Sequence, residues 1–370
     1  MCAVGRIVGF DPADYLHGIP KRFYQRYSRE LQLYLASLLL AQADSNLEWG
    51  SLDLKRVGLF DGVSRPTFAA WYEKFVESQG KPLTEAYTRA DLMVSIPGQT
   101  IGIAASLFKI RGPTYTFTST CSSGSVAVGH AFKEIRSGEI DVALATGHEC
   151  SLAAPLFAMY GDAGLLSRER GSAAKAVTPY VGYSTNAFGE GAVTLVLESR
   201  EHAEARGAPV LATLGGYHYG NNGYHPTTVD VVAVRPAEVI GELLERGGVS
   251  REDVGFVVGH GNGVQISDVS EENYMRRLFG ARATEVPLVS VKPIYGHTLG
   301  ASSSVNTAAA IMMVMNDYVV PTINIHPDNV KRFSNHQAGE GVERECKAGV
   351  STSYGMGGHN AAVLIKKFAA

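Results

Sequence analysis

The chain has 370 residues, of which 45% are hydrophobic and 19% are charged, and its formal net charge is −3. This length allows one large or two fused folded units, and this balance is typical of a globular protein rather than a disordered or fibrous one. The small net charge excludes a global attraction for nucleic acid or for an anionic membrane.

The sequence carries no signal for export or for a membrane span. The N-terminus "MCAVGRIVGFDPADY" lacks a basic segment followed by an apolar core, and no run of about 18 apolar residues occurs. The four cysteines include no C-x-x-C pair and lack the dense spacing of a secreted disulfide framework. We therefore expect a cytoplasmic protein that binds neither nucleic acid nor membrane.

The first half of the chain alternates between helical and extended patterns. Residues 26–43 repeat apolar side chains at helical spacing, and a short buried strand follows in "KRVGLFDG". Next come a helix that ends at "RGP", the strand "TYTFTST", a helix over 125–136, the strand "DVALATG" and the closing strand "GAVTLVLES".

The second half repeats this order. The strand "PVLATLGGY" precedes a helix over 235–246, the strand "VGFVVGHGNG", a helix around 270–279, the strand "PLVSVK", a helix over 301–316 and the strand "AAVLIKKF". Strands that alternate with helices predict an α/β protein with buried, largely parallel sheets. The matching order of the halves indicates an internal duplication.

Cys121 lies between a predicted strand and a predicted helix, within "TSTCSSGS". A thiol attacks as its thiolate, and its pKa falls at a helix N-terminus, where unpaired N–H groups and the helix dipole favour negative charge. The small neighbours leave the sulfur approachable, as in a nucleophile elbow. The alternative is a small buried hydrophobe, which is the usual role of a free cysteine, and this stretch alone leaves both open.

Two histidines each follow an apolar strand and stand beside glycine: His260 in "VVGHGNG", and His297 in "SVKPIYGHTLGAS", which also carries Lys292. A single histidine at a strand end is commonly structural, but two indicate a site, because α/β sheets bind ligands at the carboxyl ends of their strands. The glycines of "SYGMGGHN" are placed to give backbone N–H groups for an oxyanion hole, whereas a phosphate loop would precede a helix. No cysteine has metal-ligand spacing, so no metal site is predicted.

Nearly the whole chain, from "GFDPADY" to the C-terminus, resembles the β-ketoacyl synthases of the thiolase superfamily, of the elongating Cys-His-His type known from fatty-acid and type II polyketide synthesis. Five motifs match in order: "TSTCSSGS" for T-A-C-A-S-G, "AFGEGAVTLVLE" for G-E-G-A-G, "HGNGVQISDVSE" for H-G-T-G-T-x-x-x-D-x-x-E, "VKPIYGHTLGAS" for K-x-x-x-G-H-x-x-G-A, and "SYGMGGHN" for G-F-G-G-T-N. The resemblance implies a thiolase-like fold of two duplicated βαβαβ-type halves in a layered α-β-α-β-α sandwich. Residues 1–199 would carry the nucleophile and residues 200–370 the two histidines.

The resemblance also implies a role for each matching residue. Cys121 would carry an acyl chain as a thioester, and its N–H and that of Met356 would form the oxyanion hole. His260 and His297 would donate hydrogen bonds to the thioester oxygen of a malonyl unit as carbon dioxide leaves, and Lys292 would orient this site. The result is a decarboxylative Claisen condensation. Its substrates travel on the phosphopantetheine of an acyl carrier protein, and no metal or redox cofactor is expected.

The substrate-binding positions depart from the family pattern. Asn262 and Val264 replace threonines that hydrogen-bond the pantetheine arm, and Asn can replace one such contact whereas Val cannot. Met356 replaces a gating phenylalanine, and Asn306 replaces a glutamate that helps to fix the Lys292 network. The other substrate-binding candidates are Gly357 and Gly358 in the glycine loop, and His225, whose loop is expected to border the pocket.

The family's opening strand is absent or compressed into "VGRIVGF". A first sheet that is short by one strand has an edge that needs cover, which predicts dependence on a partner subunit. An incomplete start-site assignment explains the same gap.

These departures favour a specialised synthase, for example in polyketide or polyene biosynthesis, over a housekeeping fatty-acid enzyme. Two other functions stay open: a Cys121-dependent acyltransferase to an oxygen or nitrogen nucleophile, and a non-elongating partner subunit of a ketosynthase heterodimer. Thiolase chemistry would need a second cysteine where the chain has Met356. The expected partners are an acyl carrier protein and a related ketosynthase or chain-length subunit, in a homodimer or a heterodimer.

Overall fold

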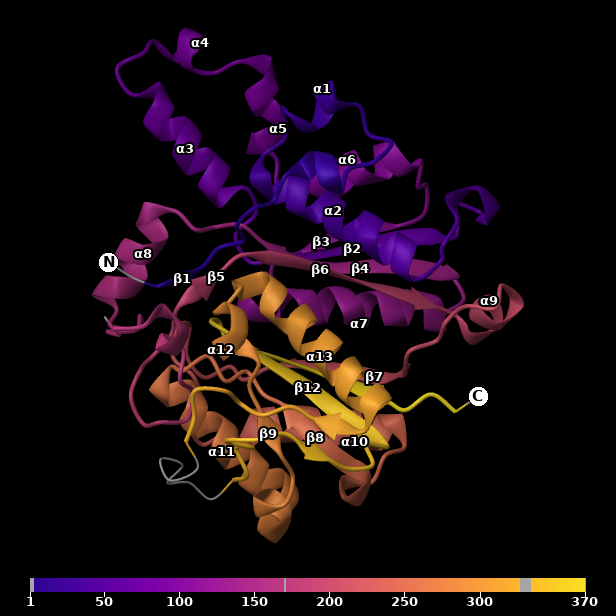
Figure 1. Cartoon of the computed structure of the whole chain (residues 1–370), viewed down its shortest axis with the longest axis vertical. Helices are drawn as coiled ribbons and strands as arrows, with labels where there is room; N and C mark the ends of the chain where they lie inside the picture. Colours follow the sequence, from indigo (N-terminus) through magenta and orange to yellow (C-terminus); the bar gives the residue numbers. More distant parts are fainter. Residues whose placement is uncertain (1–2, 170, 327–333, 370) are drawn as a thin grey trace.

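The computed structural model describes residues 3–169, 171–326 and 334–369. Two β-sheets alternate with layers of helices in the expected order α-β-α-β-α (Figure 1). Helices α2 (Arg29–Asp44) and α6 (Gln99–Phe108) cover the outer face of the first sheet. Helices α7 (Ser123–Arg136) and α13 (Ser302–Asn316) lie between the sheets, and α10 (Val234–Gly247) and α11 (Gln265–Phe279) cover the second sheet.

The first sheet has the strand order β3-β2-β4-β6. Its strands are β2 (Val57–Val63), β3 (Thr114–Phe117), β4 (Val142–Glu149) and β6 (Gly191–Glu198). Strand β2 runs parallel to β3 and β4, whereas β6 is antiparallel to β4. Because helices cover both faces, β2 and β4 are buried along their whole length.

The second sheet has the order β7-β13-β12-β8-β9. Its strands are β7 (Thr213–Asn221), β8 (Val254–Val258), β9 (Leu288–Val289), β12 (Ala348–Gly355) and β13 (His359–Lys366). Strand β8 is parallel to β12 and β9, and β13 is antiparallel to both β12 and β7. Both sheets are therefore mixed rather than largely parallel, because each half ends on an antiparallel strand.

The short elements connect these layers. The helices are α1 (Lys21–Tyr24), α3 (Phe68–Ser78), α4 (Leu83–Ala86), α5 (Leu92–Ser95), α8 (Ala154–Asp162), α9 (Arg200–Ala205) and α12 (Lys292–Tyr295). Two-residue strands pair β1 (Val4–Gly5) with β5 (Phe188–Gly189), and β10 (Tyr318–Val319) with β11 (Val342–Glu343). These pairs tie distant parts of the chain together outside the two main sheets.

The two sheets correspond strand by strand. Strands β3, β2, β4 and β6 of the first match β9, β8, β12 and β13 of the second, with the same parallel and antiparallel pairings. Among the described residues, strand β7 has no counterpart in the first sheet, which has four strands against five in the second.

Strand β12 is not among the strands expected from the sequence, and most of its residues lie in "STSYG". Its hydroxyl side chains are buried at Ser351, Thr352 and Ser353, so no apolar alternation marks it in the sequence. Thr352 donates from Oγ1 to the carbonyl oxygen of Val258 on β8. A central strand can therefore be built from small polar residues when neighbouring strands accept their hydrogen bonds.

Candidate active site

Cys121 lies in a tight turn ahead of a helix, as the sequence predicts. The turn is a short 3-10 turn over Thr120–Ser122, after β3 and directly before α7. Thr120 takes a positive φ of 51°, which is strained for a β-branched residue. A Cβ at Gly124 would lie 2.4 Å from Ser304 Oγ, so glycine is what lets α7 and α13 approach here. The turn thus presents Cys121 beside the start of α13.

His297 lies against the nucleophile. Its Nε2 is 3.2 Å from Cys121 Sγ, and its Nδ1 is 2.8 Å from Ser302 Oγ at the start of α13. His260, which follows β8, lies edge-on to His297, with ring centroids 5.2 Å apart and ring planes at 89°. The structure therefore brings the three predicted residues together from both halves of the chain.

A backbone hydrogen bond fixes the tautomer of His260. The N–H of Tyr354 donates to His260 Nδ1 at 3.4 Å, and a neutral ring whose Nδ1 accepts carries its proton on Nε2. Burial, and then the charge of Lys292, holds the pKa of His260 and of His297 well below the usual value. Both rings are therefore neutral at pH 7, and His260 is a hydrogen-bond donor without charge.

Lys292 is fully buried beside His260. Its Nζ donates to the carbonyl oxygen of His260, and burial lowers the pKa of Lys292 to about 8 against the opposing effect of Glu271. Glu271 accepts from the backbone N–H of His260. Asn306 donates from Nδ2 to the carbonyl oxygen of Gly259 at 2.8 Å, so its amide also holds the end of β8. These three side chains position the backbone that carries His260.

The Cys121 thiol is protonated at pH 7, which corrects the expectation from its place at a helix start. Burial raises the pKa of Cys121 to about 11, although the charges of Arg65 and Lys292 act to lower it. Burial therefore outweighs the helix terminus and the cations. His297 Nε2, at 3.2 Å, is the base in contact with the thiol.

Arg65 and Tyr160 also lie beside Cys121, although no motif marks them. The Arg65 guanidinium donates to Tyr160 Oη at 2.8 Å and lies 5.5 Å from its ring centroid. Tyr160 belongs to the same apolar cluster as Cys121. The sequence marks Arg65 only by its position just after β2, because ligand sites in α/β sheets lie at the carboxyl ends of the strands.

The glycine loop covers the nucleophile turn. Thr120 Oγ1 donates to the carbonyl oxygen of Met356 at 3.2 Å, and Tyr160 Oη lies 3.7 Å from Met356 Sδ. Gly357 and Gly358 take φ values of 89° and 78°, in the region that favours glycine. Met356 is therefore held near Cys121, at the edge of the apolar cluster.

The other expected binding residues lie in two different places. Asn262 and Val264 are buried, and Asn262 Oδ1 accepts the N–H of Val264 at 3.0 Å, so this oxygen is engaged within the chain. His225 is exposed on the loop after β7, and its Nδ1 accepts the backbone N–H groups of Thr227 and Thr228. His225 therefore lies outside the buried cluster around Cys121.

The described ranges, residues 3–169, 171–326 and 334–369, contain neither a metal-binding cluster nor a membrane-spanning helix. No three His, Cys, Asp or Glu side chains in those ranges are arranged to hold a metal ion. None of their helices combines the length and the apolar character needed to cross a bilayer. A cavity of about 720 Å³ lies along β6 rather than at Cys121.

Comparisons with known proteins agree with this geometry. The chain matches two family models, "Beta-ketoacyl synthase, N-terminal domain" over residues 4–203 and "Beta-ketoacyl synthase, C-terminal domain" over residues 211–326. It is 28% identical over 373 residues to the 3-oxoacyl-(acyl-carrier-protein) synthase 2 of Vibrio cholerae, with 98% of this chain and 87% of that protein covered.

Two solved structures are similar over most of their length. One is a type II PKS acyl-carrier protein in complex with its ketosynthase bound to the hexaketide, with a TM-score of 0.87, 25% identity, and 94% of this chain and 87% of that chain covered. The other is the ishigamide ketosynthase/chain length factor, with a TM-score of 0.86, 25% identity, and coverages of 98% and 87%.

Proposed function

The chain belongs to the β-ketoacyl synthase family, and from this premise we propose how its buried cluster carries out the condensation. The chain is an acyl-transferring condensing enzyme of polyketide or fatty-acid biosynthesis, as its named relatives are. The observation that carries the assignment to residues is the contact of Cys121 Sγ with His297 Nε2 at 3.2 Å, with His260 beside them.

In the first half-reaction Cys121 takes the acyl chain. The thiol proton passes to His297 Nε2, and the sulfur attacks the carbonyl carbon of an acyl thioester held on the carrier protein. The C–S bond to the carrier breaks, and the carrier sulfur takes the proton back from His297. The N–H groups of Cys121 and Met356 hold the developing oxyanion. The product is an acyl chain on Cys121 and a free carrier thiol.

In the second half-reaction the two histidines act as donors. The bond between the carboxylate and the central carbon of a malonyl thioester breaks, carbon dioxide leaves, and its electron pair forms an enolate whose oxygen is held by Nε2–H of His260 and His297. The enolate carbon attacks the acyl carbonyl, the bond to Cys121 breaks, and a proton from solvent restores the thiol. Neutral donors suit this step, because a charged histidine would transfer its proton to the enolate rather than share it.

Ser302 allows His297 to serve in both half-reactions. When Nε2 accepts from the thiol, Nδ1 donates to Ser302 Oγ, and when Nε2 donates to the enolate, Nδ1 accepts from the same hydroxyl. A hydroxyl can do both because it carries one donor and two lone pairs. The 2.8 Å contact of Ser302 with His297 therefore makes Ser302 a positioning residue.

The partners follow from the same premise. The two similar structures are named for a carrier protein in complex with its ketosynthase and for a ketosynthase/chain length factor. We infer that this chain takes its substrates from the phosphopantetheine of an acyl carrier protein and works in the cytoplasm as a dimer with itself or with a related subunit. The departures from the family pattern at Asn262, Val264 and Met356 favour a specialised acyl substrate over the substrate of a housekeeping fatty-acid enzyme.

Intact-protein mass spectrometry tests the reaction. The protein is mixed with acyl carrier protein thioesters of different chain length and then with the malonyl carrier protein, with Cys121→Ala as the test variant and Cys346→Ala as the matched control. We expect an acyl adduct on the unmodified protein and on Cys346→Ala but not on Cys121→Ala. Malonyl carrier protein should then remove this adduct as a 3-oxoacyl product. An adduct that malonyl carrier protein leaves in place would contradict condensation and favour acyl transfer, and no adduct with any thioester would contradict both.

A further inference from the structure

A turn after β2 brings a guanidinium to the wall of the active site. Arg65 stands in this turn, between the end of β2 and the start of α3. Two buried carboxylates hold the backbone on either side of it. Glu149 Oε2 accepts the N–H of Ser64 at 2.9 Å, and on the other side Glu30 Oε2 accepts the N–H of Thr67 at 2.8 Å. The guanidinium is therefore presented from a fixed backbone, which reduces the entropy lost when it binds a ligand.

The half-buried Arg65 side chain is only partly engaged within the chain. Its Nη1 donates to Ser64 Oγ at 3.1 Å, and its Nη2 donates to Tyr160 Oη at 2.8 Å. A guanidinium has five N–H donors, so most of them have no acceptor among the described residues, and no carboxylate of those residues forms an ion pair with it. The charge of Arg65 reaches the reacting thiol, because it lowers the pKa of Cys121 more strongly than Lys292 does, against the larger effect of burial.

Tyr160 adds a second donor whose acceptor is weak. Its Oη accepts from Arg65, and its own O–H donates to Met356 Sδ at 3.7 Å. A thioether sulfur is a weak acceptor, so an oxygen atom can take its place. The Tyr160 ring lies edge-on to Phe188, with centroids 4.8 Å apart, in the apolar cluster that contains Cys121. The two donors thus lie at the wall against which an acyl chain on the nucleophile would pack.

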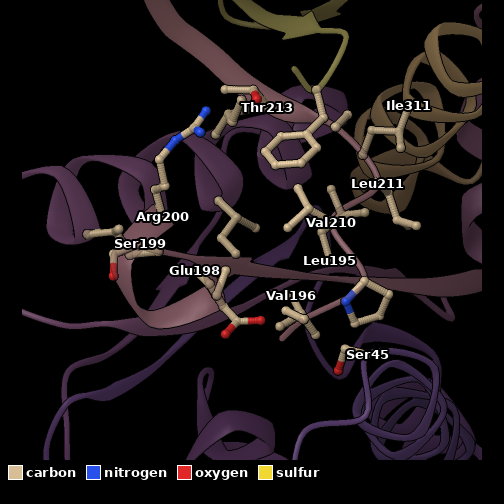
Figure 2. Close-up of a pocket in the computed structure, with 18 of the residues that line it drawn as sticks. Ser45, Leu195, Val196, Glu198, Ser199, Arg200, Val210, Leu211, Thr213 and Ile311 are labelled. Carbon is tan, nitrogen blue, oxygen red and sulfur yellow. The ribbon is translucent and has the colours of Figure 1, made fainter. Parts of the chain in front are cut away.

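The other members of this cluster are apolar, and they include Leu156, Phe157 and Leu299. The cavity along β6, which Figure 2 shows, has neither Arg65 nor Tyr160 in its lining, so the pair belongs to the nucleophile's surroundings alone. A cation that is covered by an apolar chain loses hydration and gains no partner in exchange. A purely apolar acyl chain would therefore leave this pair without an acceptor.

We propose that Arg65 and Tyr160 select an acyl chain that ends in a carboxylate, so that Cys121 carries the monoacyl group of a short dicarboxylic acid. The planar guanidinium binds a carboxylate through two parallel N–H···O bonds, and the Tyr160 O–H turns from the Met356 sulfur to the same group. Coulomb attraction falls with distance, and because the charge of Arg65 acts on the thiol itself, the selected chain has about four or five carbon atoms.

This inference rests on the proposed function, because it requires transfer of the acyl chain to Cys121. The step is the one described for the first half-reaction. The Cys121 sulfur forms a bond to the thioester carbon, the bond from that carbon to the pantetheine sulfur breaks, and this sulfur takes the proton. The distal carboxylate is bound throughout and is not consumed.

Pantetheine thioesters test this selection without the cognate carrier protein. Succinyl-pantetheine is compared with 4-methylpentanoyl-pantetheine, and glutaryl-pantetheine with 5-methylhexanoyl-pantetheine, because the chains of each pair share a shape and differ in charge. Intact-protein mass spectrometry of the full chain gives the initial rate of adduct formation, with Cys121→Ala as the background. We expect the unmodified protein to favour the carboxylate chain of each pair by roughly ten- to hundredfold, the range for a hydrogen bond to a charged group.

Variants assign the selection to the pair. Arg65→Leu should abolish or reverse the preference, and the ratio within a pair cancels any general effect of Arg65 on the reactivity of the thiol. Arg65→Lys keeps the charge without the planar fork and should retain part of the preference, and Tyr160→Phe should reduce it to a smaller extent. Arg246→Gln, at a 64% exposed side chain on α10, should keep the ratio of the unmodified protein.

The remaining outcomes separate this inference from the proposed function. Equal rates within each pair in the unmodified protein, or a preference that survives in Arg65→Leu, would overturn the inference and leave acyl transfer to Cys121 standing. The absence of an adduct with any thioester would contradict both. Acetoacetyl-pantetheine offers a neutral carbonyl oxygen, and a faster reaction with it than with succinyl-pantetheine would overturn the assignment to a carboxylate.

Discussion

At Cys121, burial and two cations act on the thiol in opposite directions, and burial is the stronger. The pKa of about 11 leaves a thiolate fraction of about 10⁻⁴ at pH 7. Within the active site the nearby His297 compensates, because it takes the proton as the sulfur attacks. A reagent that cannot use His297 as a base reacts only with the small fraction of Cys121 that is present as the thiolate.

Alkylation of Cys121 by iodoacetamide should therefore rise about tenfold per pH unit between pH 7 and pH 10, since only the thiolate reacts. Arg65→Gln should slow the reaction at every pH in this range, because the Arg65 charge lowers the pKa of Cys121. Arg246→Gln, at an exposed position on α10, is the matched control. Mass spectrometry gives the rates, and a rate that is already level at pH 7 would contradict the raised pKa.

Ser302→Ala tests the positioning of His297. Loss of the 2.8 Å hydrogen bond costs about 0.5–1.5 kcal/mol, which corresponds to a fall of about two- to tenfold in kcat, with little change in KM for the acyl carrier protein. Ser304→Ala is the control, because the Ser304 hydroxyl is buried and has no hydrogen-bond partner among the described residues. Equal losses in the two variants would indicate a packing effect and not a positioning role.

At the scale of elements, a buried charged cluster fastens helix α2 to the first sheet. His148 at the end of β4 places Nε2 2.8 Å from Asp61 Oδ1 on β2 and Nδ1 3.6 Å from Glu30 Oε1 on α2. Burial alone would lower the pKa of His148, but the carboxylates of Asp61, Glu30 and Glu149 outweigh it and raise the pKa to about 9. Burial also raises the pKa of Glu30 to about 7. Buried partners of this kind destabilise strongly when one of them is lost.

The stability of the protein should therefore fall as the pH rises from 6 to 9. The contribution of His148 to the free energy of unfolding is complete below its unfolded-state pKa of about 6.5 and is lost as the pH rises past 9. The contribution of Glu30 is also lost as the pH rises, through its folded-state pKa of about 7. His148→Gln should lower Tm at pH 6 and show a smaller fall from pH 6 to pH 9. His202→Gln, at a partly exposed pair with Glu198, should keep the wild-type slope. A Tm that rises towards pH 9 in the wild type would contradict a charged His148.

The sequence predicts most elements because their apolar patterns are local. The helices expected over 26–43, 125–136 and 301–316 are observed at 29–44, 123–136 and 302–316. Strand β12 has no such pattern, because buried hydroxyl groups replace apolar side chains in it. No local pattern indicates that β6 and β13 are antiparallel to their neighbours, because the direction of each strand depends on how that half of the chain returns to its sheet.

The same distinction applies to the site. Cys121, His260 and His297 stand at the ends of elements and beside glycine, so a local pattern marks them. The contact of Arg65 with Tyr160 joins residues 95 positions apart, and no local pattern records it. Ser302 is a similar case, because nothing in "GASSS" indicates which of its hydroxyls reaches the His297 ring.

At the scale of the whole molecule, the two halves of the chain meet through helices α7 and α13. The close packing of these two helices sets the distance between Cys121 and His297. A Cβ at Gly124 would lie 2.4 Å from Ser304 Oγ and 3.0 Å from the carbonyl oxygen of Gly300. The backbone at Gly300, just before α13, cannot move aside without moving the turn that carries His297. The packing of the two central helices is therefore part of the catalytic geometry.

Gly124→Ala should destabilise the protein by about 1–3 kcal/mol through overpacking and should lower the condensation rate more than stability alone explains. Gly102→Ala is the matched control, because it also lies within a helix but nothing lies within 4 Å of its added Cβ. This control should be neutral or slightly stabilising, since alanine favours helix. Thermal unfolding and single-turnover assays give both quantities, and a fully active, equally stable Gly124→Ala protein would show that the helices can separate freely.

The contact between Cys121 and His297 also has a genetic consequence. Although these residues come from opposite halves of the sequence, they meet within one polypeptide. An allele that encodes Cys121→Ala and an allele that encodes His297→Ala, expressed together in one cell, each produce chains with an incomplete set of reacting groups, however those chains assemble. The two alleles should fail to rescue each other and should fall into a single complementation group.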